Sequence, residues 1–533
     1  MTTSRTASNP TDGSTVRETH PHIHLSNCAG NEPDLRGAPG LERPGFVRGS
    51  FFFVTTTCST MTNFSLIFGL ALLANVGVTL QTSDTFQRWR RGSVEVEAPS
   101  EKQKQWLGLL RRYLAVYLLA ALSDWFQGPY VYALYADYGY SQHDIAILFV
   151  AGFGSSMIFG SFVGGMADWG GRKTFVLIFA VTYALSCLTK HFKNFWILMI
   201  GRLLGGVATS LLFSVFDAWM IRAHADAGVK NYLGKSFTAA SYGNYLVAIA
   251  SGIIANKAAD LAPMKPLTMG SAMYFGGYLA PFDLALLCLL ACGVLCFFLW
   301  TNNFGEADEQ SDSGRNAQWY DGLRSAALTT FRSQDILLCG AIASLFEGSM
   351  YIFVFMWTPA LSNLTSDPLP FGVIFSTFMV CCMAGSSSFG LLEKKYKSEQ
   401  IAMGVFSLGA LSMFMASACR NMTLKFLCMN IFEVAVGLYW PAMGTMKGAI
   451  VPESKRAAIY NLFRIPLNLI VLLSLLTDPP PSLAFFLNSL MLSVATIAQF
   501  ILMKRREKNG QMESTDTDEE ALLPSPVKED AAV

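Results

Sequence analysis

One stretch decides the fold of this chain: Gly164-Gly165-Met166-Ala167-Asp168-Trp169-Gly170-Gly171-Arg172-Lys173. It lies between two apolar runs, each long enough to cross a bilayer. Its glycines allow two helices to meet across a tight turn, and its charged side chains do not enter lipid. The stretch therefore predicts a polar turn between two membrane spans. The candidate gating residues in this turn are Gly164, Asp168, Gly171, Arg172 and Lys173. One more, Asp217, lies at the inner end of a later span.

The composition of the whole chain supports a membrane protein. Of its 533 residues, 52% are hydrophobic and only 14% are charged, which excludes an ordinary soluble globule. A span needs about 20 apolar residues, and twelve such stretches follow residue 110. A further apolar run covers 64–80. We therefore expect an all-α integral membrane protein with twelve transmembrane helices in two six-helix halves, plus an extra N-terminal hydrophobic helix.

The composition also changes along the chain, which divides it into six regions. Polar termini rich in Ser, Thr, Pro and Gly do not bury enough apolar surface to fold, and a hydrophilic segment separates the two groups of spans. The expected regions are a disordered N-terminal region (1–50), the extra helix (64–80), the N-terminal half (112–300), a cytosolic connector (301–334), the C-terminal half (336–503) and a disordered cytosolic tail (504–533).

The placement of Lys and Arg sets the orientation. Loops and termini on the side of the 164–173 turn hold 26 of these residues, and the opposite loops hold 6. Because basic residues gather on the cytosolic side, the turn, the connector and the C-terminus are predicted to be cytosolic. The sum of the charges, +1, carries no information about partners.

Two arginines remain inside apolar spans, Arg202 and Arg464. A charge at bilayer depth costs at least ~2.5 kcal/mol, so it normally faces a partner or a watery cavity. Three acids, Asp124, Glu347 and Glu433, are also embedded. Each charge has two interpretations: the arginines contact a substrate or form ion pairs, and the acids carry protons or neutralise the arginines. For Asp217 we favour a structural bond to the Arg172 side of the turn.

Specific segments resemble a known family. The pattern G-x-x-x-D-x-x-G-R-K and the R-x-x-x-G element at Arg202 and Gly206 resemble the major facilitator superfamily. The segments Leu122–Tyr130, Gly201–Gly206, Phe213–Trp219, Leu345–Glu347, Phe355–Pro359, Gly437–Pro441 and Asn461–Leu467 resemble the molybdate-anion transporters. The resemblance covers about 110–505 and implies high-affinity molybdate uptake by alternating access.

The residue chemistry agrees with that implication. A tetrahedral oxyanion favours planar, permanently charged donors, and arginine keeps its charge when it is partly desolvated. We therefore expect Arg202 and Arg464 to approach one dianion from the two halves. Neutral donors are expected from Asn244, Asn461, Gln127 and Tyr439. Inward movement of a dianion opposes the membrane potential, so uphill uptake requires a co-transported cation; protons carried by Asp124, Glu347 or Glu433 are our candidates.

Other function classes stay open at this point. A facilitator of the same superfamily for a sugar or organic anion, or a non-transporting anion receptor, has the same helices. An enzyme is not expected, because no catalytic, metal-ligand or phosphate-loop spacing is present. We expect no metal, no cofactor, no nucleic-acid partner and a monomer in the lipid bilayer. The plasma membrane is the expected location, and the acidic dileucine pattern in 518–523 leaves an endosomal or vacuolar membrane as the alternative.

Overall fold

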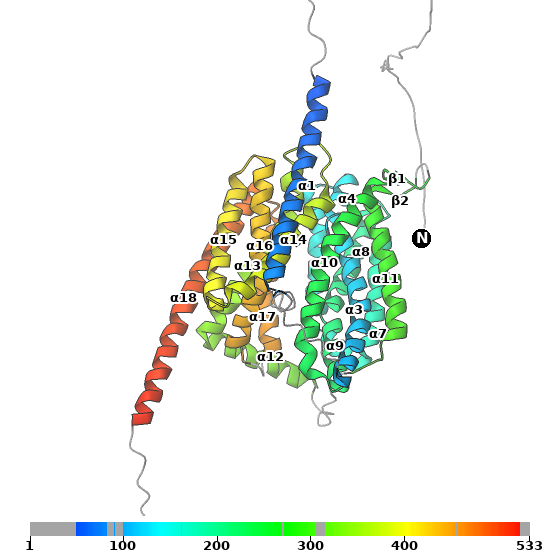
Figure 1. Ribbon diagram of the computed structural model, residues 1–533. Coiled ribbons are helices and arrows are strands. Elements are labelled where there is room, and N and C mark those ends of the chain that lie inside the picture. Colours follow the sequence, from blue (N-terminus) through cyan, green and yellow to red (C-terminus); the bar gives the residue numbers. More distant parts are fainter. Residues whose placement is uncertain are drawn as a thin grey trace, which may run out of the picture. The chain divides into compact units, whose positions relative to one another are not determined.

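The computed structural model describes residues 49–82, 90, 100–160, 162–268, 271–304, 315–452 and 456–522 (Figure 1). It separates into two units. In the first, Met1–Phe53, the described part is the start of helix α1; the second, Val54–Val533, contains the rest of α1 and the other described elements. The region predicted to be disordered, 1–50, therefore lies almost entirely outside the described residues.

The N-terminal half consists of membrane helices joined by short elements. Its long helices are α3 (Glu101–Gln127), α5 (Gln142–Gly160), α7 (Arg172–Thr189), α8 (Phe195–Leu212), α10 (Leu233–Asp260) and α11 (Ala280–Leu299). Its short elements are α4 (Val131–Asp137), α6 (Val163–Gly170), α9 (Val215–Asp226), η1 (Lys230–Tyr232), η2 (Gly277–Leu279) and the antiparallel strands β1 (Lys265–Pro266) and β2 (Tyr274–Phe275).

The C-terminal half follows the connector helix α12 (Arg315–Arg332). Its helices are α13 (Gln334–Ser362), α14 (Phe371–Leu392), α15 (Ser398–Ala418), α16 (Met422–Ile450), α17 (Arg456–Leu476) and α18 (Pro481–Leu522). In the described part of the chain, twelve helical segments are long and apolar enough to cross a membrane, one of them in α1 (Gly49–Thr82). The apolar part of α17 is shorter, Leu462–Leu476.

The 164–173 stretch folds differently from its prediction in one respect. Rather than one tight turn, its first part forms the short helix α6, and the chain reverses at Gly171, where φ is +88°. A side chain there is strained by the positive φ, and its Cβ would lie 2.3 Å from Asn302 Nδ2. At Gly171, therefore, the fold requires a residue without a side chain.

Hydrogen bonds from side chains to backbone carbonyls, together with stacked indole rings, hold the inner end of this half together. Lys173 Nζ donates to Phe297 O of α11 (2.7 Å), and Trp219 Nε1 donates to Thr301 O (2.9 Å). The Trp219 and Trp300 rings stack with centroids 3.8 Å apart. The motif therefore ties α7 to the end of α11, while the tryptophans tie α9 to the same end.

The two halves meet chiefly along two pairs of helices, α10 with α14 and α5 with α17. In the first pair, a Cβ on Gly372 would lie 2.0 Å from Gly252 O, so the two backbones touch. Ser376 Oγ donates to Ile249 O (2.8 Å) beside this contact. In the second pair, Gln142 Nε2 donates to Asp478 Oδ1 (2.5 Å). These contacts lie toward the predicted outer ends of the helices, so the two halves are closed against each other on the outer side.

Helix α1 packs across the α10–α14 pair. The Phe64 ring meets Phe426 of α16 edge-on, with centroids 4.9 Å apart. Phe68 and Ala71 pack on a cluster that includes Ile249 of α10 and Val380 of α14. The sequence predicts this extra helix over 64–80, and the observed helix begins earlier, at Gly49. Its contacts show that it covers the place where the two halves meet.

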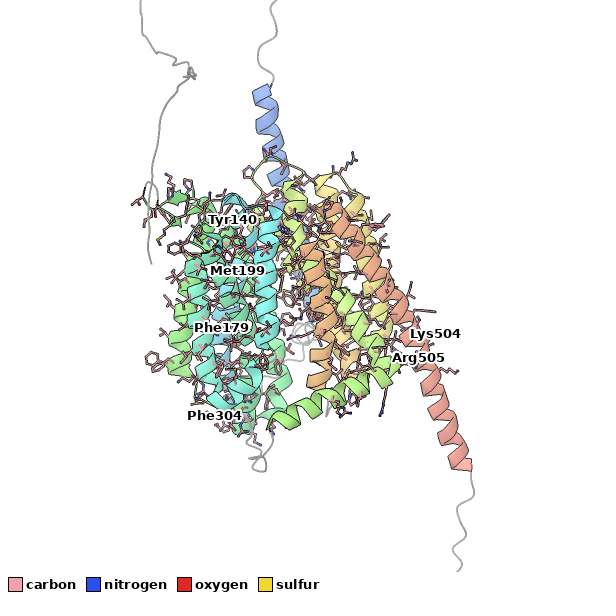
Figure 2. All side chains as sticks on the ribbon, turned by 180° about the vertical axis from the view of Figure 1, so that it is seen from behind. Tyr140, Phe179, Met199, Phe304, Lys504 and Arg505 are labelled. Atoms are coloured by element: carbon pink, nitrogen blue, oxygen red, sulfur yellow. The ribbon has the colours of Figure 1, made fainter. Side chains whose placement is uncertain are left out.

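The connector and the tail contain more helix than the sequence predicts. In the connector (301–334), α12 packs on α17 through Ala326, which is fully buried. In the predicted disordered tail (504–533), α18 continues to Leu522. Figure 2 shows Lys504 and Arg505 on this helix as it leaves the bundle, and Arg505 Nε pairs with Asp335 Oδ1 at 3.0 Å.

Candidate functional site

Arg202 lies on α8 with its guanidinium group directed at α5. Its Nε donates to Leu148 O (3.1 Å), and its central carbon lies 4.5 Å from the centroid of the Phe149 ring. Of the carboxylates that the structure describes, none forms an ion pair with it. Its side chain is half-buried. The guanidinium Nη atoms are thus available to an anion.

Two glycines make this placement of Arg202 possible. A Cβ on Gly206 would lie 2.3 Å from Gly152 O, so α8 and α5 are in backbone contact at that point. A Cβ on Gly152 would lie 2.7 Å from Arg202 Nη2. In the R-x-x-x-G element, Gly206 therefore lets α8 pack directly against α5. Gly152 on α5 leaves room for the guanidinium group of Arg202.

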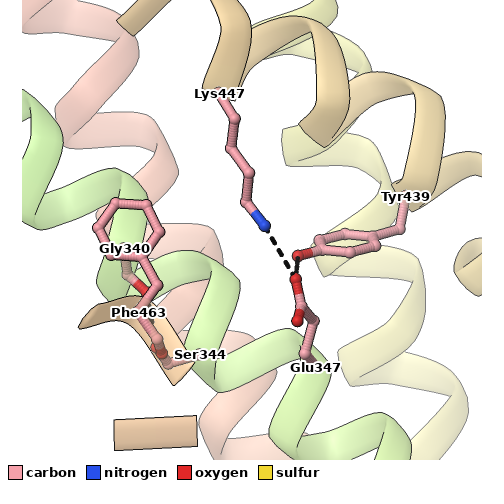
Figure 3. Close-up of polar contacts among 6 residues, drawn as sticks. All are labelled: Gly340, Ser344, Glu347, Tyr439, Lys447 and Phe463. Carbon is pink, nitrogen blue, oxygen red and sulfur yellow. Dashed lines mark hydrogen bonds and ion pairs between the residues drawn. The ribbon is translucent and has the colours of Figure 1, made fainter. Parts of the chain in front are cut away.

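Arg464 lies on α17, where this helix packs against α13. Ser344 Oγ donates to Phe463 O (2.9 Å), and a Cβ on Gly340 would lie 2.3 Å from the Phe463 ring (Figure 3). These contacts fix the backbone just before Arg464. The Arg464 side chain is exposed, with Nη1 at 3.9 Å from the Cβ position of Gly160 on α5. No described carboxylate pairs with it either.

Glu347 belongs to a network on α13 and α16 that the sequence did not indicate. Lys447 Nζ pairs with Glu347 Oε1 at 3.0 Å, and Tyr439 OH donates to the same oxygen at 2.7 Å (Figure 3). The side chains of Glu347 and Lys447 are 17% and 19% exposed. Lys447, which lies in the last turn of α16, is thus the cation that neutralises Glu347. The hydroxyl hydrogen of Tyr439 is already used, so its predicted role as an anion donor is not met in this conformation.

Aromatic rings join the two halves between the arginines. The Phe149 ring meets Phe355 of α13 (5.1 Å between centroids), and Phe153 meets Tyr351 (5.3 Å). Arg202 contacts α5 at 148–152, whereas Arg464 approaches it at Gly160. That is a difference of two to three turns of α5, since an α-helix has about 3.6 residues per turn. The two arginines therefore lie at different levels of the bundle, and the expected simultaneous approach to one dianion is not formed in this conformation.

The predicted neutral donors differ in their availability. Trp125 Nε1 donates to Asn244 Oδ1 (2.8 Å), which leaves the amide NH₂ of Asn244 without an acceptor among the described residues. Gln127 is buried, and its Nε2 donates to Ser123 O (3.1 Å), which satisfies the end of α3 before the break at Gly128. The side chain of Asn461 lies outside the described residues.

Two of the three predicted acids have no cation beside them. Asp124 accepts a hydrogen bond from Tyr183 OH and forms no ion pair with Arg202. Glu433 is 5% exposed, and in the described part of the chain it has neither a hydrogen bond nor an ion pair. A buried carboxyl group without a neutralising cation is costly in its charged form.

The predicted gating residues lie at the inner end of the first half. Arg172 Nη1 donates to Ala218 O (3.1 Å), the carbonyl that follows Asp217 in α9. This contact reaches the helix backbone next to Asp217, the residue for which the sequence indicated a bond to this side of the turn. Gly164 lies in α6, and the side chain of Asp168 lies outside the described residues. Lys173 contacts α11, as described above.

A bundle of two six-helix halves, with unpaired arginines where the halves meet, defines a multi-pass membrane transporter of the major facilitator fold. Comparison with protein families agrees: residues 90–427 match a family described as sugar transporters with 12 transmembrane segments. Among solved structures, a nucleoside transporter superimposes with a TM-score of 0.57 at 12% identity, over 74% of this chain and 99% of that one. A D-xylose–proton symporter gives a TM-score of 0.55 at 12% identity, over 74% and 96%. At this identity the likeness concerns the fold alone.

Curated relatives define the family more narrowly. The molybdate-anion transporter of Takifugu rubripes is 32% identical over 392 residues, 68% of this chain and 78% of that protein. Those of Xenopus tropicalis and Xenopus laevis are 36% and 35% identical, over 68% and 77% of this chain and 77% and 86% of theirs. The chain therefore belongs to the molybdate-anion transporter family of the major facilitator superfamily.

Proposed function

We propose that this protein takes up molybdate with high affinity by alternating access, coupled to protons, in the plasma membrane. The single observation that carries the proposal is the pair of arginines, Arg202 and Arg464, each directed at α5 and neither paired with a described carboxylate. An unpaired cation inside a membrane protein is costly. A dianion that passes between the halves offsets this cost.

The different depths of the two arginines indicate how the anion moves. Arg202 lies at the level of the aromatic contacts between α5 and α13, against the Phe149 ring, and Arg464 lies on their inner side, where it is exposed. In the conformation with closed outer ends, the anion reaches Arg464 from the cytosol. When the halves rock, the rings separate and the anion passes from Arg202 to Arg464. The two arginines thus act in sequence on one anion.

The membrane potential makes a coupling ion necessary. Moving a dianion inward against about 100 mV costs about 4.6 kcal/mol, at ~2.3 kcal/mol per charge. More than two protons must accompany each anion for entry to be favoured by the potential. Asp124 and Glu433 are the proposed carriers, because Glu347 is neutralised by Lys447. A monomer contains all the groups that the proposal uses.

Uptake of radiolabelled molybdate by cells that express the chain tests this proposal. We expect saturable uptake that falls when a proton ionophore collapses the pH gradient, and that tungstate inhibits. Asp124→Asn and Glu433→Gln should reduce the dependence on the gradient while surface expression is retained. Inhibition by sugars or organic anions, but not by tungstate, would indicate a facilitator for an organic solute. Molybdate binding to purified protein without flux in proteoliposomes would indicate a receptor.

A further inference from the structure

A second buried cation lies one residue beyond the outer end of α7. Lys190 follows the last residue of α7, and it is 1% exposed. Its ammonium nitrogen lies 5.8 Å from the centroid of the Tyr135 ring and 3.3 Å from the Cβ position of Gly201. Within the described residues, Nζ has no hydrogen-bond acceptor and no carboxylate partner.

A buried hydroxyl next to this lysine also lacks a partner. Tyr135 on α4 is fully buried, and its OH forms no hydrogen bond. The Arg202 charge lies close enough to Lys190 to lower the pKa of its ammonium group. A buried ammonium group and a free hydroxyl therefore lie together where α4 meets the end of α7 and α8, within reach of the Arg202 charge. Unsatisfied groups of this kind are rare in protein interiors, and each such group calls for an explanation.

We propose that Lys190, Tyr135 and Arg202 form the outer binding site for the oxyanion, with Lys190 as the residue that selects a doubly charged anion. The inference rests on the proposed function and adds a residue to it. Lys190 and Arg202 carry two positive charges, which one dianion neutralises. A monovalent anion leaves one charge uncompensated in a medium of low dielectric constant, where that charge is costly. The Tyr135 hydroxyl donates to a remaining oxygen.

Because the site needs a charged Lys190, its affinity for the anion depends on pH. Burial, followed by the nearby Arg202 charge, lowers the pKa of Lys190 to about 7. The empty site is therefore partly deprotonated at neutral pH, and a dianion favours the charged form. Binding then takes up a proton, so affinity is greatest below the pKa of the empty site and falls as pH rises above it. From about pH 6 to about pH 8 we expect a roughly tenfold loss of affinity.

Other titratable and charged groups surround Lys190. They are Cys187 on α7, Arg202 on α8, Tyr135 on α4, Tyr138 after α4, Asp124 with Tyr183 further in, and His191 with Asp283. Burial lowers the pKa of His191, but its bonds to Asp283 and to Tyr274 O outweigh this and raise that pKa. Because His191 is a second titratable group next to Lys190, the test must separate the two residues.

Equilibrium binding of radiolabelled molybdate to the purified full-length protein in detergent provides the test, since no proton gradient is then present. Wild type should show the roughly tenfold weakening between about pH 6 and about pH 8. Lys190→Met should bind at least tenfold more weakly at both pH values, and nitrate or perchlorate should then compete better relative to tungstate. Lys190→Arg, whose charge is permanent, should bind tightly with a flat pH profile. Lys193→Met, an exposed lysine of the same loop, is the matched control and should behave as wild type.

The outcomes separate this inference from the proposed function. If wild type neither binds nor transports molybdate, the proposed function fails. If wild type binds and Lys190→Met has unchanged affinity and pH dependence, only the role of Lys190 fails. If Lys190→Met does not fold, the Lys190→Arg variant provides the test. If its affinity depends on pH in the same way as that of wild type, the inference is contradicted, and the pH dependence belongs to His191.

Discussion

Replacement of Arg202 by methionine is expected to abolish molybdate uptake while the protein still reaches the membrane. Its guanidinium group donates to Leu148 O through Nε and leaves the Nη atoms unpaired. Loss of two charge-assisted hydrogen bonds to the anion costs about 3 kcal/mol or more, which is at least a hundredfold in affinity. Arg202→Lys should retain a small part of the activity, because lysine keeps the charge but loses the planar fork.

The matched control for this variant is Arg222→Met. Arg222 lies in the same half, but it is paired with Asp226 at 2.9 Å within α9. We expect near-normal uptake from this control. Wild-type uptake by Arg202→Met at equal surface expression would show that the guanidinium is a structural group, for which the Leu148 carbonyl and the Phe149 ring provide sufficient contacts.

Substitution of Gly372 by alanine should trap the transporter with its outer side open. The new Cβ would lie 2.0 Å from Gly252 O and 2.8 Å from Asn256 Cβ, so α10 and α14 must separate at their outer ends. The halves then cannot close there, and the inward-facing state is lost. We expect uptake to fall at least tenfold, which corresponds to about 1.4 kcal/mol. Expression should change little, because each half keeps its own core.

Gly390→Ala on the same helix is the control, since its Cβ would meet nothing within 4 Å. The conformational effect is measured with a cysteine placed at Phe355, which is 1% exposed and contacts α5. In the Gly372→Ala background, an impermeant thiol reagent applied outside should label this cysteine faster than in the Gly390→Ala background. Equal labelling in both would mean that the α10–α14 contact does not close the outer side.

The membrane helices could be predicted from the sequence because each is an apolar run of characteristic length. The breaks inside them were less visible. The first span is divided at Gly128 and Pro129 and the fourth at Phe213, and the polar turn begins as helix α6. Helix α18 also continues into the tail as far as Leu522, where polar composition alone indicated disorder. Local composition does not show whether a polar segment has a packed surface against which to fold.

The sequence predicts the charged residues of the site that lie within apolar runs, but not those at the ends of helices. A charge within an apolar run is conspicuous in a sequence, and so Arg202, Arg464, Asp124, Glu347 and Glu433 were selected. Lys447 and Lys190 were missed because they lie at the ends of helices, where a lysine normally points to water. Their side chains extend back into the protein, toward Glu347 and Tyr135. Pairing across helices, such as Glu347 with Lys447, depends on tertiary packing that no local pattern encodes.

The most direct measurement is a structure of the purified protein with bound tungstate, a heavy dianion of the same shape as molybdate. The account predicts density for one tungstate within hydrogen-bond distance of Arg464 when the outer ends are closed, or of Arg202 when they are open. A tungstate held elsewhere, with neither guanidinium group contacting it in either conformation, would contradict the account.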